Sequence, residues 1–173
     1  LADMPNRHDM LLIAGVATAL EKAKEAVVST ACNPIRRGEE VFSPNVVKVV
    51  LDSRGYALYF SRAPIPFARD AWAASGMQDA PRGLPCYRHV GIYAYRAGFL
   101  GKYSRLEPSP LARFEALEQL RVLWHGYRIA VASTGTDPPQ DAHTPEDLDN
   151  ARHPGHAWRP PTTHAQRSKP QEA

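Results

Sequence analysis

The sequence has few cysteines and no long apolar run. Its two cysteines, Cys32 and Cys86, are far apart and form no CxxC pattern. This excludes a cysteine-based zinc site, makes a disulfide framework unexpected and favours a reducing compartment. No apolar run approaches the roughly 20 residues of a membrane-spanning helix, and the first residues lack the pattern of a secretory signal. We therefore expect a cytoplasmic protein without membrane insertion.

Most of the chain also has no excess charge of either sign. Residues 1–149 contain 17 basic and 17 acidic side chains, so the formal net charge of +3 comes entirely from residues 150–173. Four cations among prolines, with Trp158 as one aromatic neighbour, are a weak basis for nucleic-acid binding, and we expect no such partner. We expect a folded domain at 1–149 and a disordered, basic, Pro/His-rich tail at 150–173.

Alternating helix and strand patterns predict an α/β domain. We expect a helix at 11–25, strands at 26–31, 45–51, 56–60, 87–96 and 127–132, and a hairpin loop at 52–55. Residues 63–86, rich in alanine, proline and glycine, are expected to form a loop with one short helix. In the strand at 87–96, alternation places His89 and Tyr93 on the same face.

Two further helices are expected near the C-terminal end. Ser109 is a suitable N-cap and Pro110 a suitable first residue for a helix whose apolar stripe reaches Trp124, with Gly126 ending it. Thr144 and Pro145 begin a second, shorter helix in the same way.

Four blocks of the sequence resemble the 3-deoxy-manno-octulosonate cytidylyltransferases (CMP-Kdo synthetases). In order, they read PNVVKVVLDSRGYALYFSRAPIPFARD, YRHVGIYAYRAGFL, PSPLARFEALEQLRVLWHGYRIAV and TPEDL. The resemblance covers roughly residues 11–150. It implies a Rossmann-like nucleotidyltransferase fold with a mixed sheet. It also implies cytidylyl transfer from CTP to 3-deoxy-manno-octulosonate (Kdo) for lipopolysaccharide synthesis, with Mg²⁺ as cofactor and a homodimer as the assembly.

The resemblance also implies which residues contact Kdo. Arg62 would bind the Kdo carboxylate, for which a two-pronged guanidinium is suited. The other implied contacts are His89, Tyr93, Glu118 and Gln119. Taken without the resemblance, each has a plainer interpretation. Arg62 would form an ion pair with a nearby carboxylate, and Glu118 would form one with Arg121. His89 and Tyr93 would be structural residues of their strand.

The metal-binding and CTP-binding features of the family are weak in this sequence. A loop that would hold the CTP phosphates is not found, so we expect an N-terminally truncated domain. The family's Mg²⁺-binding aspartate has one candidate, Asp3. Before TPEDL, where the family has a second carboxylate, the sequence has His143, with Asp141 two residues earlier. An imidazole is a poor replacement for a carboxylate on Mg²⁺, so we expect a damaged metal site.

Two functions from different classes follow. The chain is either part of a cytidylyltransferase or a non-catalytic Kdo-binding or dimerising module.

We predict that the chain alone has little or no turnover, because most ligands of Mg²⁺ and the CTP phosphates are missing from its pattern. Pyrophosphate release with CTP, Kdo and Mg²⁺ measures this directly. Robust release would contradict the prediction.

Overall fold

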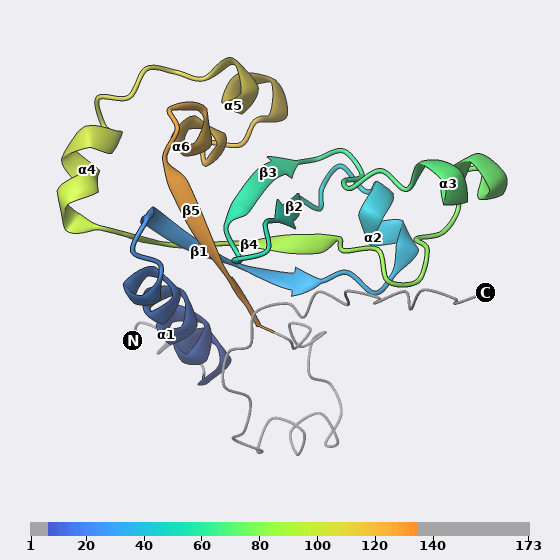
Figure 1. Cartoon of the computed structure of the whole chain (residues 1–173), viewed down its shortest axis with the longest axis horizontal. Helices are drawn as coiled ribbons and strands as arrows, with labels where there is room; N and C mark the ends of the chain where they lie inside the picture. The colour runs from blue at the N-terminus through green and yellow to red at the C-terminus, as the bar shows by residue number, and fades with distance from the viewer. Residues whose placement is uncertain (1–6, 135–173) are drawn as a thin grey trace, which may run out of the picture.

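The computed structural model describes residues 7–134, which form a mixed five-stranded sheet with helices on both faces (Figure 1). The strands are β1 (Ala26–Pro34), β2 (Lys48–Leu51), β3 (Ala57–Ser61), β4 (Tyr87–Tyr95) and β5 (Arg128–Ser133). Their order across the sheet is β3-β2-β4-β1-β5. β1 and β5 run parallel, whereas the β1–β4, β2–β4 and β2–β3 pairs are antiparallel. The predicted α/β class with a mixed sheet is confirmed.

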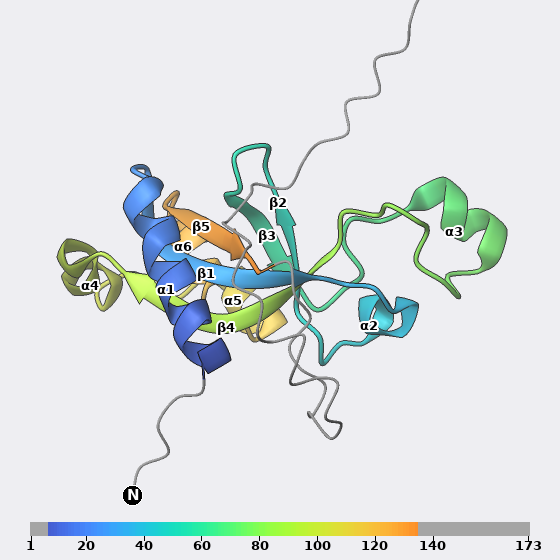
Figure 2. The ribbon, with the colours of Figure 1, turned by 90° about the horizontal axis from the view of Figure 1, so that it is seen from below.

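The helices form three groups around this sheet. Helix α1 (Arg7–Lys22) lies on one face, and α4 (Ala97–Tyr103), α5 (Pro110–Glu115) and α6 (Leu120–Trp124) lie on the other (Figure 1). Helices α2 (Gly38–Phe42) and α3 (Arg69–Ser75) extend from one end of the sheet (Figure 2). No helix among residues 7–134 combines the length and the apolar character needed to cross a membrane.

The apolar side chains follow the alternation of the strands. In β5, Ile129 and Val131 belong to the main core, on the side of α4, α5 and α6, whereas Ala130 packs with Leu20 of α1. Phe60 of β3 and Leu120 of α6 are fully buried in that main core. A third, smaller cluster around Trp72 joins α2 to α3.

The hairpin between β2 and β3 has the predicted loop. The Asp52 carboxylate accepts hydrogen bonds from the backbone N–H groups of Arg54 and Tyr56, and Gly55 has φ +84°, a conformation that glycine adopts without strain. The loop then reaches β5, because the Val131 N–H donates to the Gly55 carbonyl at 3.0 Å and Tyr56 bridges Ala130. The sheet is therefore curved, so that the hairpin loop next to the edge strand β3 contacts the other edge strand, β5.

The single helix predicted from Pro110 to Trp124 is wrong. Ser109 caps α5 as expected, but the chain turns at Ala116, which has φ +52°, and resumes as α6. The turn buries Leu117 in the core and leaves Phe114 91% exposed, so the expected apolar stripe does not exist as one face. Tertiary packing here prevails over the helical pattern.

Other element bounds differ by a few residues. Helix α1 ends at Lys22 rather than 25, and β1 continues to Pro34 instead of ending at 31. Helices α2 and α4 were not predicted, whereas α3 is the short helix expected within residues 63–86. The helix expected to begin at Thr144, the tail at 150–173 and the boundary between the two predicted regions lie outside the described residues.

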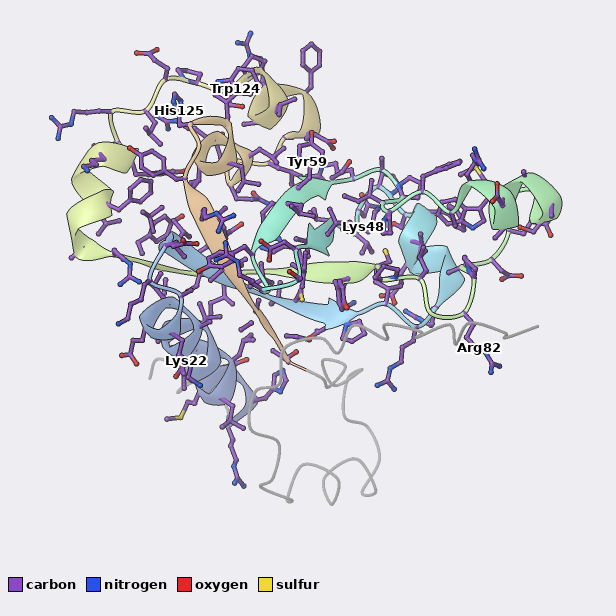
Figure 3. The ribbon with its side chains drawn as sticks, in the orientation of Figure 1. Lys22, Lys48, Tyr59, Arg82, Trp124 and His125 are labelled. Atoms are coloured by element: carbon purple, nitrogen blue, oxygen red, sulfur yellow. The ribbon has the colours of Figure 1, made fainter. Side chains whose placement is uncertain are left out.

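Lys48, at the start of β2, is a fully buried lysine (Figure 3). Its Nζ donates to the carbonyl oxygens of Ser43 at 2.7 Å, Val46 at 2.6 Å and Arg62 at 2.6 Å. Burial lowers the pKa of Lys48, but three acceptors match the three N–H groups of an ammonium. This side chain therefore joins the segment after α2 to the end of β3.

We predict that Lys48→Met destabilises the fold by about 3 kcal/mol or more, because the three partly buried carbonyls around the Lys48 ammonium lose their donor. Urea unfolding followed by circular dichroism measures the free energy of unfolding. Lys24→Met, at an exposed position, is the matched control and is expected to change it by less than about 0.5 kcal/mol. Equal effects of the two substitutions would contradict the structural role of Lys48.

Candidate functional site

A row of aromatic rings runs along the face of β4 that turns toward α4. His89 and Tyr93 lie on this face, as predicted, with ring centroids 5.6 Å apart. Tyr93 neighbours Tyr95 at 6.1 Å, and Tyr95 neighbours Tyr103 of α4 at 5.7 Å. All four side chains are only partly buried, so the row combines packing with access to solvent.

A buried threonine orients His89. Thr30 Oγ1, in β1, lies 2.7 Å from the Ile92 carbonyl oxygen and 2.9 Å from His89 Nε2. The hydroxyl has one proton, and the carbonyl is its closest acceptor, so the Thr30 oxygen accepts from Nε2–H. We assign this tautomer from the network of contacts. It leaves His89 Nδ1 as an acceptor, suited to a ligand hydroxyl.

Burial determines the charge state of these rings. It lowers the pKa of His89 to about 4, and it raises the pKa of Tyr93 above its ordinary value. Both groups are neutral at pH 7. A neutral imidazole beside a neutral phenol can exchange hydrogen bonds with a polyhydroxylated ligand, but neither attracts an anion.

Arg62 follows β3 and binds backbone carbonyls. Its Nε donates to the Glu115 carbonyl oxygen at 2.8 Å, its Nη1 to that of Pro44 at 3.0 Å and its Nη2 to that of Ala116 at 3.3 Å. The bonds to Glu115 and Ala116 satisfy carbonyls at the turn between α5 and α6, where a continuous helix would have satisfied them internally. Arg62 therefore holds the turn that leads to Glu118 and Gln119.

The two residues of that turn segment have different surroundings. Gln119 is buried at the start of α6. Glu118 is exposed and lines a hollow of about 280 Å³ together with Arg113, Arg121 and Ser109. The contact between Glu118 and Arg121 is a backbone hydrogen bond, from the Arg121 N–H to the Glu118 carbonyl at 3.0 Å, and not the side-chain ion pair that their spacing suggested.

The predicted Kdo contacts thus form two groups, one on β4 and one around the turn between α5 and α6, and Arg121 joins them. His89 and Tyr93 touch directly, and Arg62 bonds to the turn before Glu118. Arg121 connects the groups, because its guanidinium lies 5.3 Å from the centre of the Tyr103 ring, at the end of the aromatic row. Arg121 Nε also bonds to the Glu107 carbonyl oxygen at 3.3 Å, and His125 Nε2 lies 3.0 Å from the same oxygen.

A larger hollow, of about 480 Å³, lies elsewhere. It is lined by residues between 14 and 23, in α1 and directly after it, by residues 54–56 of the hairpin, and by Ala130 and Val131 of β5. Its lining is mostly apolar and includes none of the predicted Kdo contacts.

The predicted metal ligands Asp3, Asp141 and His143 all lie outside the described residues. Within residues 7–134, no cluster of three or more histidine, cysteine, aspartate or glutamate side chains could hold a metal ion. The described part of the chain therefore offers no ligand set for Mg²⁺.

Three polar residues of this region were not predicted from the sequence. Lys48 was recognisable as the single charge in an apolar strand. Thr30, in β1, and Glu115, at the end of α5, gave no such signal, since their partners are some 60 and 50 residues away along the chain.

We predict that the acid sensitivity of the fold depends on His89. Its pKa is lower in the folded chain than in the unfolded chain, so the unfolded state takes up the proton first as the pH falls below about 6.5. Between pH 7 and pH 5 this costs on the order of 2 kcal/mol of stability. Urea unfolding at both pH values should show that loss in the native chain and a clearly smaller one in His89→Gln. Equal losses would refute the prediction.

The chain is similar to known cytidylyltransferases. The sequence pattern of the family described as "Cytidylyltransferase" matches residues 10–129. The 3-deoxy-manno-octulosonate cytidylyltransferase of Nitrosococcus oceani is 53% identical over 141 residues, which is 82% of this chain and 54% of that protein. The protein of the same name from Acidovorax sp. (strain JS42) is 49% identical over 83% of this chain and 57% of its own length.

A solved structure agrees with the sequence comparisons. CMP:2-keto-3-deoxy-manno-octonic acid synthetase, determined in complex with CTP, superposes with a TM-score of 0.64 at 34% identity. The match covers 86% of this chain and 56% of the other, so this chain spans little more than half the length of the relatives it matches. With the mixed sheet, these matches show that the chain belongs to the cytidylyltransferase family.

Proposed function

We propose that this chain forms the Kdo-binding side of an enzyme that transfers the cytidylyl group of CTP to Kdo. The observation that carries the proposal is the placement of neutral His89 beside Tyr93 on a partly exposed sheet face, in a chain whose relatives are 3-deoxy-manno-octulosonate cytidylyltransferases. Kdo presents several hydroxyls and one carboxylate. The aromatic row suits the hydroxyls, and Arg62 suits the carboxylate.

The reaction is a nucleotidyl transfer. The anomeric hydroxyl oxygen of Kdo forms a bond to the α-phosphorus of CTP, the bond from that phosphorus to the bridging oxygen breaks, and pyrophosphate and one proton leave. In this step the described residues bind and orient the sugar, so that its hydroxyl faces the nucleotide. Glu118 and Gln119 complete the set of proposed Kdo contacts.

Mg²⁺ remains part of the proposal as the group that neutralises phosphate charge when bound. The residues predicted to hold it are Asp3, Asp141 and His143. A cytoplasmic location and a homodimer also remain predictions that accompany this function.

The alternative is a Kdo-binding or dimerising module without catalysis. It predicts the same sugar contacts and differs in turnover. The distinguishing measurement is therefore pyrophosphate release when the chain is supplied together with the CTP-binding half of a family member. Release under these conditions favours the enzyme.

We predict that the chain binds Kdo without CTP, as measured by isothermal titration calorimetry. His89→Ala is expected to weaken binding about tenfold, because Nδ1 no longer accepts a hydrogen bond from the sugar. The methyl ester of Kdo, which lacks the negative charge, should bind more weakly than Kdo itself. Lys24→Ala, at an exposed position in the connection between α1 and β1, serves as the control.

An absence of Kdo binding by the native chain would contradict the proposed function. Equal binding of Kdo and its ester would contradict the role of Arg62. Self-association in sedimentation velocity without Kdo binding would favour the dimerising module.

A further inference from the structure

Glu115, the last residue of α5, holds the end of β3 with its carboxylate. Its Oε1 accepts a hydrogen bond from Ser61 Oγ at 2.6 Å, and its Oε2 accepts one from the backbone N–H of Arg62 at 3.0 Å. Each carboxylate oxygen thus accepts a hydrogen bond from one of two consecutive residues. The contact links segments that are more than 50 residues apart in the sequence.

The side chain of Arg62 returns to the same helix end. Its Nε donates to the Glu115 carbonyl oxygen and its Nη2 to that of Ala116, while its Nη1 reaches the Pro44 carbonyl. A guanidinium has five N–H groups, and three are occupied here. One N–H remains on each terminal nitrogen. A carboxylate can accept from both together.

Neighbouring side chains help to hold the Glu115 carboxylate and the Arg62 backbone in place. Burial raises the pKa of Tyr59, and the negative charge of Glu115 and a hydrogen bond to it raise it further. Tyr59, in β3, lies on the side of that strand toward α5 (Figure 3). Lys48 Nζ binds the Arg62 carbonyl oxygen from the opposite side. Glu115 and Lys48 thus hold the Arg62 backbone at its N–H and at its carbonyl.

We propose that Glu115 is a positioning residue for Kdo binding. It fixes the Arg62 backbone, so that the two remaining N–H groups of the guanidinium are presented together to the substrate carboxylate. The same contacts set the Ala116 turn, from which Glu118 and Gln119 follow. This inference rests on the proposed function, since it assigns the Kdo carboxylate to Arg62.

A purely structural Glu115 would stabilise the fold without acting through Arg62. The two roles differ in how the substitutions combine. If Glu115 acts through Arg62, its removal has no further effect on Kdo affinity once the guanidinium is gone. If removal of Glu115 instead caused a general loss of structure, it would lower Kdo affinity both in the native chain and in Arg62→Ala.

The test is a double-mutant cycle on the full chain, with Kdo affinity measured by calorimetry. Glu115→Ala is expected to weaken Kdo binding about tenfold in the native background and less than about twofold in Arg62→Ala. Glu115→Gln keeps an oxygen for the Arg62 N–H and an N–H for the Ser61 hydroxyl. It should therefore retain affinity within about threefold of native. Glu107→Ala, which removes an exposed carboxylate, is the control for lost charge.

A second measurement does not require Kdo. In ¹⁵N-labelled chain, the Nε–Hε signal of Arg62, assigned by its loss in Arg62→Ala, should be sharp in the native chain and in Glu115→Gln. In Glu115→Ala it should broaden or shift toward free arginine. An unchanged signal in Glu115→Ala, or equal affinity losses in both arms of the cycle, would overturn the positioning role. If the native chain fails to bind Kdo while this signal responds as expected, the proposed function falls, and with it the link to Kdo, whereas control of Arg62 by Glu115 stands.

Discussion

The bonds of Arg62 to the carbonyls of Glu115 and Ala116 are the constraint on which the candidate site depends. They allow the chain to leave the helical path after α5, because the carbonyls freed by the turn find a donor on the residue that follows β3. As a result, the turn places Leu117 in the core and Glu118 at the surface. One guanidinium therefore couples the packing of α6 to the arrangement of the proposed sugar contacts.

The sequence was sufficient wherever a local rule decided the structure. The hairpin follows from Asp52 and Gly55, whose hydrogen bonds and φ value belong to the loop itself. Ser109 caps α5 because a serine before a proline suits that position. The common face of His89 and Tyr93 follows from the two-residue period of a strand. Family membership was equally accessible, since its blocks are long and ordered.

The rest depended on partners distant in the sequence. No pattern within 110–124 reveals that Arg62 will bind the carbonyls at Ala116, so an uninterrupted helix was the reasonable and wrong expectation. The network of Glu115 with Ser61, and the contact of Thr30 with His89, likewise join separate elements. Propensity describes a segment by itself, whereas these contacts arise when the sheet brings two segments together.

The way in which the hairpin joins the sheet has a mechanical consequence. β2 pairs with β4 through two residues, Lys48 and Val49, and the far end of the hairpin contacts β5 through Gly55 and Tyr56. The hairpin is thus attached at both ends and spans the main core between them. Because Arg62 directly follows β3, these two attachments also set the position of the proposed carboxylate ligand relative to β4 and its aromatic row.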